Sequence, residues 1–514
     1  MLTKSDLLSF RQCPRKLWLE KNPPAQMPAN DSASRKLLYY GNAVGAKARE
    51  QLGNPLWPPR QANHEMAAQG TMALLKKSPG QAMVEVHMAH ADLYARADAL
   101  VPRQDGYALR ETKASTFPLN RDGTAGDAED HHLYDVAIQA WVMEGSELPM
   151  ACVEINYLDN RWRYPGNNDY SGLFRQLDVT AAIEERKAEV PEMLRQAQAM
   201  LDGPMPEATT GKQCTSPYEC PFIPFCKQRE PAEPEHPIEL LPGSAGKGLA
   251  KKLRAAKGYE SILEPSPDEL TGKQAGLFRR IQNAHRSGQA ILEPGSDAIM
   301  KGFPYPRYYF DFEGIDLAIP LWQGTRAYEQ IPFQWSCHIE RSSSVFEHAE
   351  FLQLDGNDPS LPCIQRMREA INPADQGPIF VYHAVYERGR LEELAERHPE
   401  YTDLLNGYIG RLVDLRPIVE NHFYHPNMQG SFSIKKVLPV IAPDLNYDDL
   451  DEIQGGTGAQ DAFIEAALHP ETTPERKAEL ENGLRTYCRQ DTWALVELAY
   501  FLERKGRPAR PRGM

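Results

Sequence analysis

Apolar and polar side chains alternate along residues 307–314, a short aromatic run that also carries two acids. Because successive side chains of a β-strand point to opposite faces, this run predicts a strand with Phe310 and Phe312 on one face. Asp311 and Glu313 then share the other face. Two carboxylates therefore point in one direction from a single strand.

Other elements follow from hydrophobic periodicity and from residues that start and stop helices. Further strands are predicted at residues 83–87, 91–101, 107–113, 330–340 and 379–383, and the alternating segment 330–340 is expected to pair with the strand at 307–314. Helices are predicted at residues 41–50, 134–143, 246–258, 270–286, 384–395 and 481–502. An earlier helix is capped by Thr3 or Ser5 and ends at Cys13.

The helix predicted at residues 481–502 carries an acid inside its apolar stripe. The stripe consists of Leu484, Cys488, Leu495, Leu498 and Leu502. Asp491 falls within it at helical spacing, and Tyr487 lies one turn earlier on the same side. A buried carboxylate without a partner is strongly unfavourable, so Asp491 requires a cation. The alternative is an ordinary ion pair with Arg485 or Arg489.

Length predicts the domain organisation. A chain of 514 residues is too long for one hydrophobic core, which predicts two domains and a connector. A proline- and acid-rich hinge at residues 230–237 marks the end of the first domain. The expected divisions are a first domain at 1–232, a basic helical connector at 233–303, a second domain at 304–505 and a flexible tail at 506–514.

Charge and hydropathy limit the class of protein. The formal net charge of −14 argues against a wholly basic nucleic-acid coat protein, but a nuclease needs only a local basic track. No apolar run is long enough to span a bilayer, and no signal-peptide pattern begins the sequence, so we expect a cytoplasmic protein without a membrane anchor. The two basic helices of the connector are either a phosphate-binding track or a solvated helical face.

The paired acids Asp311 and Glu313 have two interpretations. Carboxylates aimed at one point repel one another, and a divalent cation such as Mg²⁺ or Mn²⁺ cancels that repulsion. The alternative is a half-exposed strand with two solvated acids. Downstream, Glu387 lies in the first turn of the helix after the strand at 379–383, and Asp414 adds a further acid.

A second group of candidates lies on the strands of the first domain. Asp98 precedes Glu111 by one hairpin, and Lys113 shares a strand face with Glu111. Such acids can hold a metal against a phosphate, and the lysine can stabilise charge that develops on phosphorus. Glu85 on the preceding strand and Gln139 on the following helix are accessory candidates. Most isolated Glu-x-Lys pairs are solvated strand residues, which is the alternative here.

These residues resemble the RecB-type branch of the PD-(D/E)XK nucleases, which has a restriction-endonuclease-like α/β fold. The likeness is greatest to its CRISPR-associated Cas-four and AddB-like members, which carry an iron–sulfur cluster. Under that resemblance, Asp98, Glu111 and Lys113 match the catalytic acid, acid and lysine, with a metal held by the two acids. Gln139 opens a version of the family's Gln-x-x-x-Tyr motif.

The bunched cysteines extend the same resemblance. Cys214, Cys220 and Cys226 recur at even spacing among prolines and aromatic residues, and Cys13 makes a fourth thiol. Four thiolates are the number that a 4Fe–4S cluster needs. A structural Zn²⁺ is the alternative, although zinc sites usually show Cys-x-x-Cys pairs, which are missing here.

The second domain resembles the DEDD 3′–5′ exonucleases, which are built on the ribonuclease H-like α/β fold. Asp311, Glu313, Glu387 and Asp491 match the four acids, which would hold two Mg²⁺ or Mn²⁺ ions about 3.5–4 Å apart. Tyr487 matches the residue that orients the attacking water in the tyrosine subclass of that family.

Three positions depart from these patterns. Met143 stands where Tyr is usual in the Gln-x-x-x-Tyr motif, and Gly45 stands where many relatives place a metal-binding His. Glu387 stands where DEDD relatives carry Asp. These departures support an alternative of another class, a nucleic-acid-binding scaffold in which one or both sites are inactive.

Nearly the whole chain is similar to a bacterial family whose C-terminal part is a domain of unknown function. That likeness is carried by residues 2–5, 12–19 and 319–336. Together, the resemblances imply a two-site, metal-dependent nuclease that cleaves nucleic-acid phosphodiesters, with DNA favoured over RNA, in DNA repair, nucleic-acid processing or phage defence.

Overall fold

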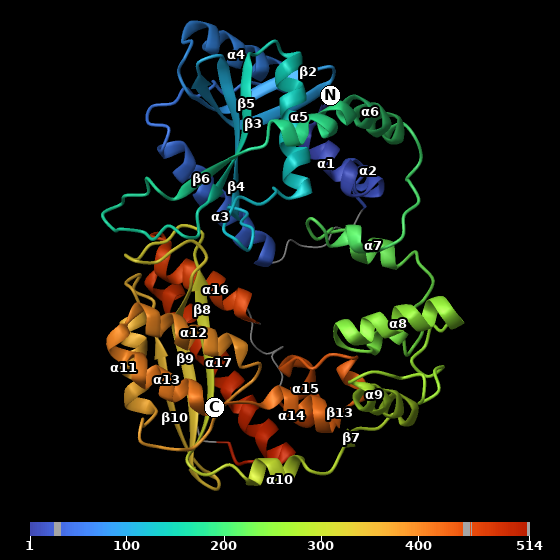
Figure 1. The fold of residues 1–514 in the computed structure, drawn as a ribbon, viewed down its shortest axis with the longest axis vertical. Helices are drawn as coiled ribbons and strands as arrows, with labels where there is room; N and C mark the ends of the chain where they lie inside the picture. Colours follow the sequence, from blue (N-terminus) through green and yellow to red (C-terminus); the bar gives the residue numbers. More distant parts are fainter. Residues whose placement is uncertain (25–31, 446–452, 454, 511–514) are drawn as a thin grey trace. The chain divides into compact units, whose positions relative to one another are not determined.

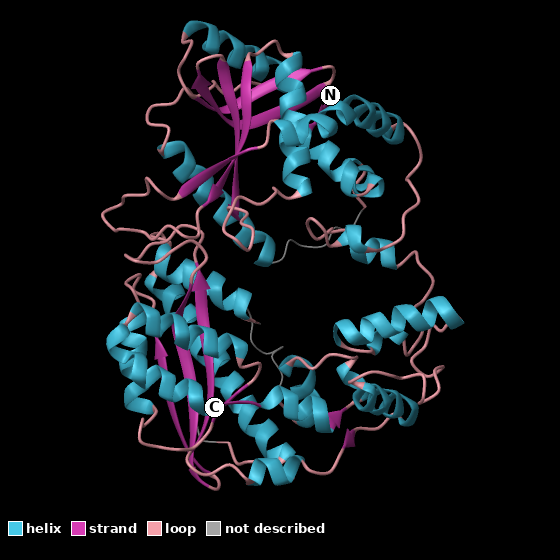
Figure 2. Ribbon diagram, viewed as in Figure 1, coloured by secondary structure: helices cyan, strands magenta, loops and turns pink. Residues whose placement is uncertain are grey.

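The structure is a computed structural model that describes residues 1–24, 32–445, 453 and 455–510. The chain forms two compact units, described here one at a time. The first consists of Met1–Pro231 and Leu317–Glu329, and the second of Ala232–Asp316 and Gln330–Met514. Both units combine helices with sheets of parallel and antiparallel strands, so the predicted α/β class is confirmed (Figures 1 and 2).

The first unit is built on a six-stranded sheet in which β1, β3, β4, β5 and β6 lie in that order and β2 pairs with β3. The elements of this unit are β1 (Leu2–Thr3), α1 (Lys4–Gln12), α2 (Pro14–Lys21), α3 (Ser32–Glu50), α4 (His64–Lys77), β2 (Met83–His90), β3 (Leu93–Arg103), β4 (Gly106–Thr116), α5 (Asp130–Gly145), β5 (Met150–Leu158), β6 (Phe174–Asp178), α6 (Glu184–Leu201) and α7 (Ile223–Lys227).

Local sequence explains several boundaries in this unit. Thr3 caps α1: its hydroxyl accepts from the Asp6 N–H at 3.2 Å, and the Asp6 carboxylate accepts from the Thr3 N–H at 2.9 Å. The helix ends at Cys13, as predicted. Strand β3 begins at Leu93 because Ala91 and the residue after it have positive φ angles and turn the chain.

Helix α5 connects β4 to β5 and packs on the sheet against β2, β3 and β5. Since β4 and β5 are parallel, their connection has to cross the sheet, and α5 makes that crossover. Its inward face carries Val136, Ala140 and Met143, all fully buried. The same helix therefore presents Gln139 toward the strands that carry Asp98 and Glu111.

The second unit contains a five-stranded sheet in the order β10, β9, β8, β11, β12, and a small two-stranded sheet of β7 and β13. Its elements are α8 (Gly243–Lys257), α9 (Ala275–Ser287), β7 (Ile291–Leu292), α10 (Ser296–Lys301), β8 (Arg307–Asp316), β9 (Gln330–Ser342), β10 (Val345–Leu352), α11 (Ser360–Ala370), β11 (Ile379–Val381), α12 (Val385–Arg397), α13 (Thr402–Arg411), β12 (Leu412–Asp414), α14 (Leu415–His422), β13 (Phe423–Tyr424), α15 (Ile434–Ile441), α16 (Gly456–Phe463) and α17 (Pro474–Leu502).

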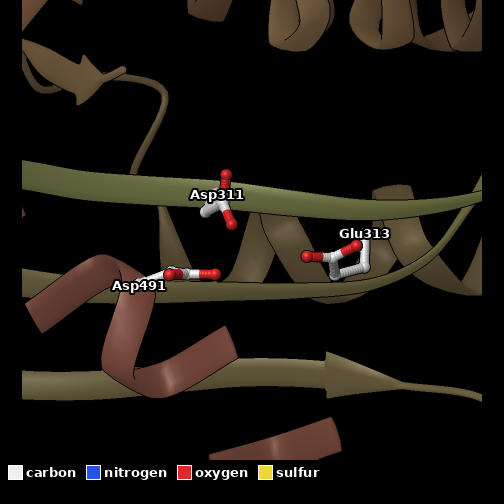
Figure 3. Close-up of side chains that lie close together, drawn as sticks. All are labelled: Asp311, Glu313 and Asp491. Atoms are coloured by element: carbon white, nitrogen blue, oxygen red, sulfur yellow. The ribbon is translucent and has the colours of Figure 1, made fainter. Parts of the chain in front are cut away.

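Strand β8 is central, antiparallel to β9 and parallel to β11. Its alternation matches the prediction. Phe310 and Phe312 enter a core shared with α11, α12 and α13, whereas α17 packs against β8 and β9. Asp311 and Glu313 point toward α17, where Asp491 lies (Figure 3).

The division of the chain differs from the expected one in three places. Residues 233–303 belong to the second unit, because β7 pairs with β13 and the Arg280 guanidinium donates to the Glu420 carbonyl at 2.6 Å. Residues 317–329, expected in the second domain, belong to the first unit: the Gly324 N–H donates to the Tyr164 carbonyl at 2.8 Å.

The expected flexible tail at 506–514 also differs from the structure in its first part. Arg510 pairs with Asp444 at 3.0 Å, and Arg507 pairs with Glu497 at 2.9 Å. Residues 511–514 lie outside the described residues. Across the described residues, the structure contains no helix both long and apolar enough to cross a bilayer.

Candidate active site

Three acids from distant parts of the chain meet in the second unit. Asp311 and Glu313 come from β8 and Asp491 from α17, and one carboxyl oxygen from each lies within 4.8 Å of the other two (Figure 3). We call these residues the acid triad. Oxygen ligands of this charge suit Mg²⁺ or Mn²⁺, so the triad can hold a divalent ion.

Burial and repulsion perturb the triad carboxyls. Burial, and then the charges of Asp491, Glu313 and Glu387, raise the pKa of Asp311 well above its ordinary 3.8. Burial and the charge of Asp491 raise the pKa of Glu313 to about 8, and Lys435 offsets only part of that rise. Without a bound cation, the triad therefore holds protons near neutral pH. A divalent ion would displace them and remove the repulsion.

Tyr487 lies one turn before Asp491 on α17 and is 4% exposed. Its hydroxyl hydrogen-bonds to Asp491, and burial followed by the triad charges raises the pKa of Tyr487 far above 10. The hydroxyl thus keeps its proton at neutral pH. It lines the same cavity as the triad, where it can donate to a water or a phosphate oxygen.

Glu387 is buried at the start of α12, and its Oε2 has no hydrogen-bond partner among the described residues. It is close enough to raise the pKa of Asp311 by its charge, but it is not one of the three acids within 4.8 Å. Burial raises the pKa of Glu387 itself to about 8, with a further contribution from Asp414.

Asp414 holds the turn that precedes Glu387. Its carboxylate accepts from the backbone N–H groups of His383 at 2.9 Å and Ala384 at 3.1 Å, and it caps α14 by accepting from the Arg416 N–H at 2.9 Å. Since His383 has a φ of 71°, these bonds stabilise a strained turn. Asp414 therefore positions α12 and is not part of the triad.

The triad opens into a cavity of about 420 Å³. Other residues that line it include Gln330, Tyr382, Tyr386, Lys435, Gln460 and Leu495. Lys435 comes from the first turn of α15, and Gln460 donates to the Gly314 carbonyl at 3.0 Å. Sequence reasoning missed Lys435 and Gln460 because no local spacing connects them to β8. A cation beside a carboxylate cluster suits a phosphate-bearing ligand.

The two arginines near Asp491 make other contacts. Arg485 Nη1 lies 2.8 Å and Arg489 Nη2 lies 3.2 Å from the two oxygens of Glu350 on β10. Both guanidinium groups are thus engaged by Glu350, which weakens the alternative that they serve as ordinary ion-pair partners of Asp491.

In the first unit, Asp98, Glu111 and Lys113 also lie together. Asp98 accepts from the Thr112 N–H at 2.7 Å, and the Lys113 ammonium lies 2.9 Å from Glu111 Oε1. Burial, and then the charge of Glu111, raise the pKa of Asp98 to about 7. The two acids are thus close enough for the charge of one to perturb the other.

Two further charged residues complete this group. Lys4 Nζ lies 2.6 Å from Asp135 Oδ1 and 3.4 Å from Glu111 Oε1, and Lys113 pairs with the other oxygen of Asp135. Gln139 donates to Glu111 at 2.8 Å and to Asp135 at 2.9 Å. We call Lys4, Glu111, Lys113, Asp135 and Gln139 the acid–lysine network.

Asp135 and Lys4 were not predicted as site residues. Asp135 could have been found, because it lies one helical turn before Gln139 and so shares its face. Lys4 carries no such signal, since 107 positions separate it from Glu111. Although burial favours the neutral form, the ammonium groups of Lys113 and Lys4 lower the pKa of Asp135 overall.

Glu85, expected as an accessory acid, lies outside this network. Its two carboxylate oxygens pair with Arg49 at 3.0 Å and Arg96 at 3.1 Å. The Arg49 guanidinium also lies 3.2 Å from the point where a Cβ on Gly45 would be. The Arg49 side chain thus occupies the space beside Gly45.

The four clustered cysteines line one small cavity in the first unit. Cys13 joins α1 to α2, Cys214 ends a 3₁₀ turn, Cys220 follows, and Cys226 lies in α7. All eight cysteines are described, and each is a free thiol. The Gly211 N–H donates to Cys214 Sγ at 3.4 Å, and Arg15 donates to Cys226 Sγ at 3.8 Å. N–H donors of this kind stabilise the thiolate form of a cysteine.

The spacing of these thiols bears on the choice of metal. A tetrahedral zinc site with Zn–S bonds of about 2.3 Å places its sulfurs roughly 3.8 Å apart. Among the described residues, no three of the four cysteines bring their sulfurs within 4.8 Å of one another. The four sulfurs thus lie further apart than in a closed tetrahedral zinc site.

Comparisons with known proteins identify relatives but not a function. Residues 308–433 match the model of the family described as "Domain of unknown function (DUF2779)", which supports the likeness to such a bacterial family. An alignment 319 residues long, which covers 53% of this chain, is 23% identical to "Uncharacterized protein UU173" of Ureaplasma parvum serovar 3 (strain ATCC 700970). The chain spans 46% of that protein's length.

A solved structure described as "Crystal structure of SSO0001" aligns with 45% of this chain and 87% of its own, at 13% sequence identity and a TM-score of 0.22. At that score, the likeness supports no statement about fold or function.

Proposed function

We propose that this protein is a metal-dependent nuclease whose principal active site is the acid triad. The observation that carries the proposal is the convergence of Asp311, Glu313 and Asp491 to within 4.8 Å in a cavity that Tyr487 and Lys435 also line. The central acid-bearing strand, with α17 across it, supports a ribonuclease H-like fold of the DEDD exonuclease type.

Each residue around the triad has a role in this proposal. The triad, with Glu387 beside it, would hold Mg²⁺ or Mn²⁺. Bound divalent ions supply an activated water and stabilise the leaving oxygen in phosphodiester hydrolysis. Tyr487 keeps its proton and orients the attacking water by a hydrogen bond. Lys435 contacts a phosphate oxygen of the substrate, for which DNA is favoured over RNA by resemblance alone.

A second metal-dependent site of the PD-(D/E)XK type is proposed in the first unit, at Asp98, Glu111 and Lys113. It is supported by the shared face of the two acids and by a cavity of about 230 Å³ that reaches Lys113 and Asp135. Arg11 and Lys16 also line that cavity and would attract a phosphate backbone.

We further propose that Cys13, Cys214, Cys220 and Cys226 hold a 4Fe–4S cluster, with zinc as the alternative. The support is that all four cysteines, the number of thiolates such a cluster needs, line one cavity. Anaerobically purified protein should be brown, and Cys220→Ser should bleach it, whereas Cys152→Ser, a matched change at an unclustered cysteine, should not. Colourless protein that contains zinc would overturn the cluster.

The alternative function is a nucleic-acid-binding scaffold without cleavage. One observation favours it for the first unit, namely that the network's two ammonium groups already balance its two carboxylates. Under this alternative, the acids of the first unit serve stability and the chain binds nucleic acid passively.

The deciding experiment uses end-labelled single-stranded DNA and RNA with Mn²⁺. We expect Asp311→Ala to remove most cleavage and Asp98→Ala to remove a second, separate product pattern. Asp297→Ala, at a half-buried acid paired with Lys301 in the second unit, is the matched control and should cleave like the wild type. If neither site variant changes cleavage, the scaffold is the correct assignment.

A further inference from the structure

Lys4 occupies the position that a cation would take in the first unit. Its ammonium lies between Asp135 and Glu111, at 2.6 Å and 3.4 Å, and its side chain is 16% exposed. Strand β1 and the Thr3 cap fix the backbone on either side of it, since β1 pairs with β3 and α1 begins at Lys4. The ammonium is thus held at this place by the fold.

Glu111 has little capacity left for a metal. Its Oε1 receives two ammonium groups, from Lys4 and Lys113, and its Oε2 accepts from Gln139. A carboxylate oxygen offers about two lone-pair sites. Coordination at Oε1 therefore requires one ammonium to leave. A divalent ion there would also lie close to two positive charges, which disfavours binding.

A second observation indicates that the network is incomplete without a ligand. Gln139 is fully buried and gives its amide N–H groups to Glu111 and Asp135, but its carbonyl oxygen has no donor among the described residues. An unsatisfied buried acceptor is costly. A metal-bound water or a substrate hydroxyl at this place would satisfy it.

Of the two ammonium groups that contact Glu111, that of Lys4 is the one that can leave. Lys113 shares β4 with Glu111 and makes the shorter contact, 2.9 Å against 3.4 Å. Lys4 reaches the network from another element on a flexible four-carbon arm. If it released Glu111, it would keep Asp135, its closer partner.

We propose that Lys4 is a tethered competitor of the divalent ion at the first-unit site: its ammonium bridges Glu111 and Asp135 in the metal-free protein and leaves Glu111 when metal binds. This inference rests on the proposed role of Asp98 and Glu111 as metal ligands. Its consequence is that the first site is weakly metallated at Mn²⁺ concentrations that fill the acid triad.

The test is Mn²⁺ binding by calorimetry to the full chain carrying Asp311→Asn and Asp491→Asn, which removes the triad signal. In that background, Lys4→Met should tighten Mn²⁺ binding at least tenfold, and Lys4→Arg should leave it close to the parent. Adding Asp98→Asn to Lys4→Met should abolish binding. Lys4→Gln serves as the second neutral variant if Lys4→Met does not fold.

Lys16→Met is the matched control. It removes a positive charge that lines the same cavity as Lys113 and Asp135, but Lys16 Nζ donates to Gln12 at 2.7 Å rather than to the network. An equal gain in affinity in Lys16→Met would overturn the inference in favour of general electrostatics. Unchanged or weaker binding in Lys4→Met would also overturn it. Absence of Mn²⁺ binding in every variant would reject the first metal site itself, and the inference with it.

Discussion

In the acid–lysine network, buried carboxylates share two ammonium groups, whereas in the acid triad three carboxyls meet beside Lys435 with far less compensation. Both groups lie on one side of a sheet and face a helix, α5 in the first unit and α17 in the second. The pKa of Asp135 is lowered, while the pKa values of Asp311 and Glu313 are raised. Near neutral pH, the buried carboxyl of Asp135 is thus ionised, whereas the similarly buried carboxyls of Asp311 and Glu313 hold protons.

A buried acid cluster with little compensating charge calls for a cation, whereas a cluster already paired with ammonium groups has to release one of them before a metal binds. The triad requires a cation to become fully ionised near neutral pH. In the network, by contrast, each carboxylate oxygen is already matched to an N–H donor, and only the Gln139 carbonyl oxygen lacks a donor among the described residues. Four measurements test this contrast between the two sites.

Asp491→Asn should abolish Mn²⁺ binding in the second unit and lower the cleavage rate by about 10²–10³-fold, the usual scale for losing one electrostatic element of an active site. The fold should persist, because Asn keeps the shape and removes repulsion. Calorimetry and the end-labelled cleavage assay measure the two effects. Glu481→Gln, on the same helix and paired with Arg485, is the control. Unchanged Mn²⁺ affinity in Asp491→Asn would reject the triad as a metal site.

Asp135→Ala should destabilise the first unit by about 3–5 kcal/mol, since it leaves two buried ammonium groups to share Glu111. Urea denaturation of the full chain measures this loss. Glu144→Ala is the matched control, because Glu144 lies on the same helix and pairs with Lys187 at the surface, where such a pair contributes about 0–1 kcal/mol. If the two variants lost the same free energy of unfolding, the network would contribute no more to stability than an ordinary surface ion pair.

Mn²⁺ affinity of the triad should rise with pH up to about pH 8, because metal binding displaces protons from Glu313 and Glu387, each with a pKa raised to about 8. Each displaced proton changes the apparent affinity about tenfold per pH unit. Calorimetry in buffers of different ionisation enthalpy counts the protons released.

The raised pKa of Glu313 also makes the free energy of unfolding depend on pH. Since the folded-state pKa of Glu313 lies above its ordinary 4.5, the metal-free folded chain binds more protons than the unfolded chain between about pH 4.5 and 8. The free energy of unfolding should therefore fall as pH rises through that window, and Mn²⁺ should reverse the fall. A pH-independent Mn²⁺ affinity would show that the triad is already ionised.

Thr3→Ala should cost about 1 kcal/mol, the usual loss when a helix loses its N-cap, and should loosen Lys4 at the start of α1. Thr473→Ala removes the corresponding cap of α17 and provides the comparison in the other unit. Hydrogen exchange should speed up at the start of each affected helix. If Thr3→Ala left exchange around Lys4 unchanged, the network itself, rather than the helix cap, would hold that residue in place.

Much of the second unit could be predicted from local pattern. The alternation at Phe310–Glu313 is decided by the two-residue period of a strand, and it correctly assigned the acids to the face opposite the aromatic core. The position of Asp491 in an apolar stripe follows from the helical period in the same way. In the first unit, helix α1 likewise ends at Cys13, as predicted from the sequence.

Partners that lie far apart in sequence could not be predicted. Nothing in the spacing connects Lys4 to Glu111, and Lys435 enters the triad cavity from a helix more than a hundred positions after β8. The assignment of residues 317–329 to the first unit was also missed, because it depends on backbone hydrogen bonds that join Gly324 and Thr325 to Tyr164.

Which side chains share a face depends only on the period of each strand or helix, so it can be read from the sequence. Whether the charges on such a face are neutralised depends on the tertiary structure. Coulomb interactions depend on distance through space, and the ammonium groups that neutralise Glu111 and Asp135, or fail to neutralise the triad, are brought there by packing between elements remote along the chain.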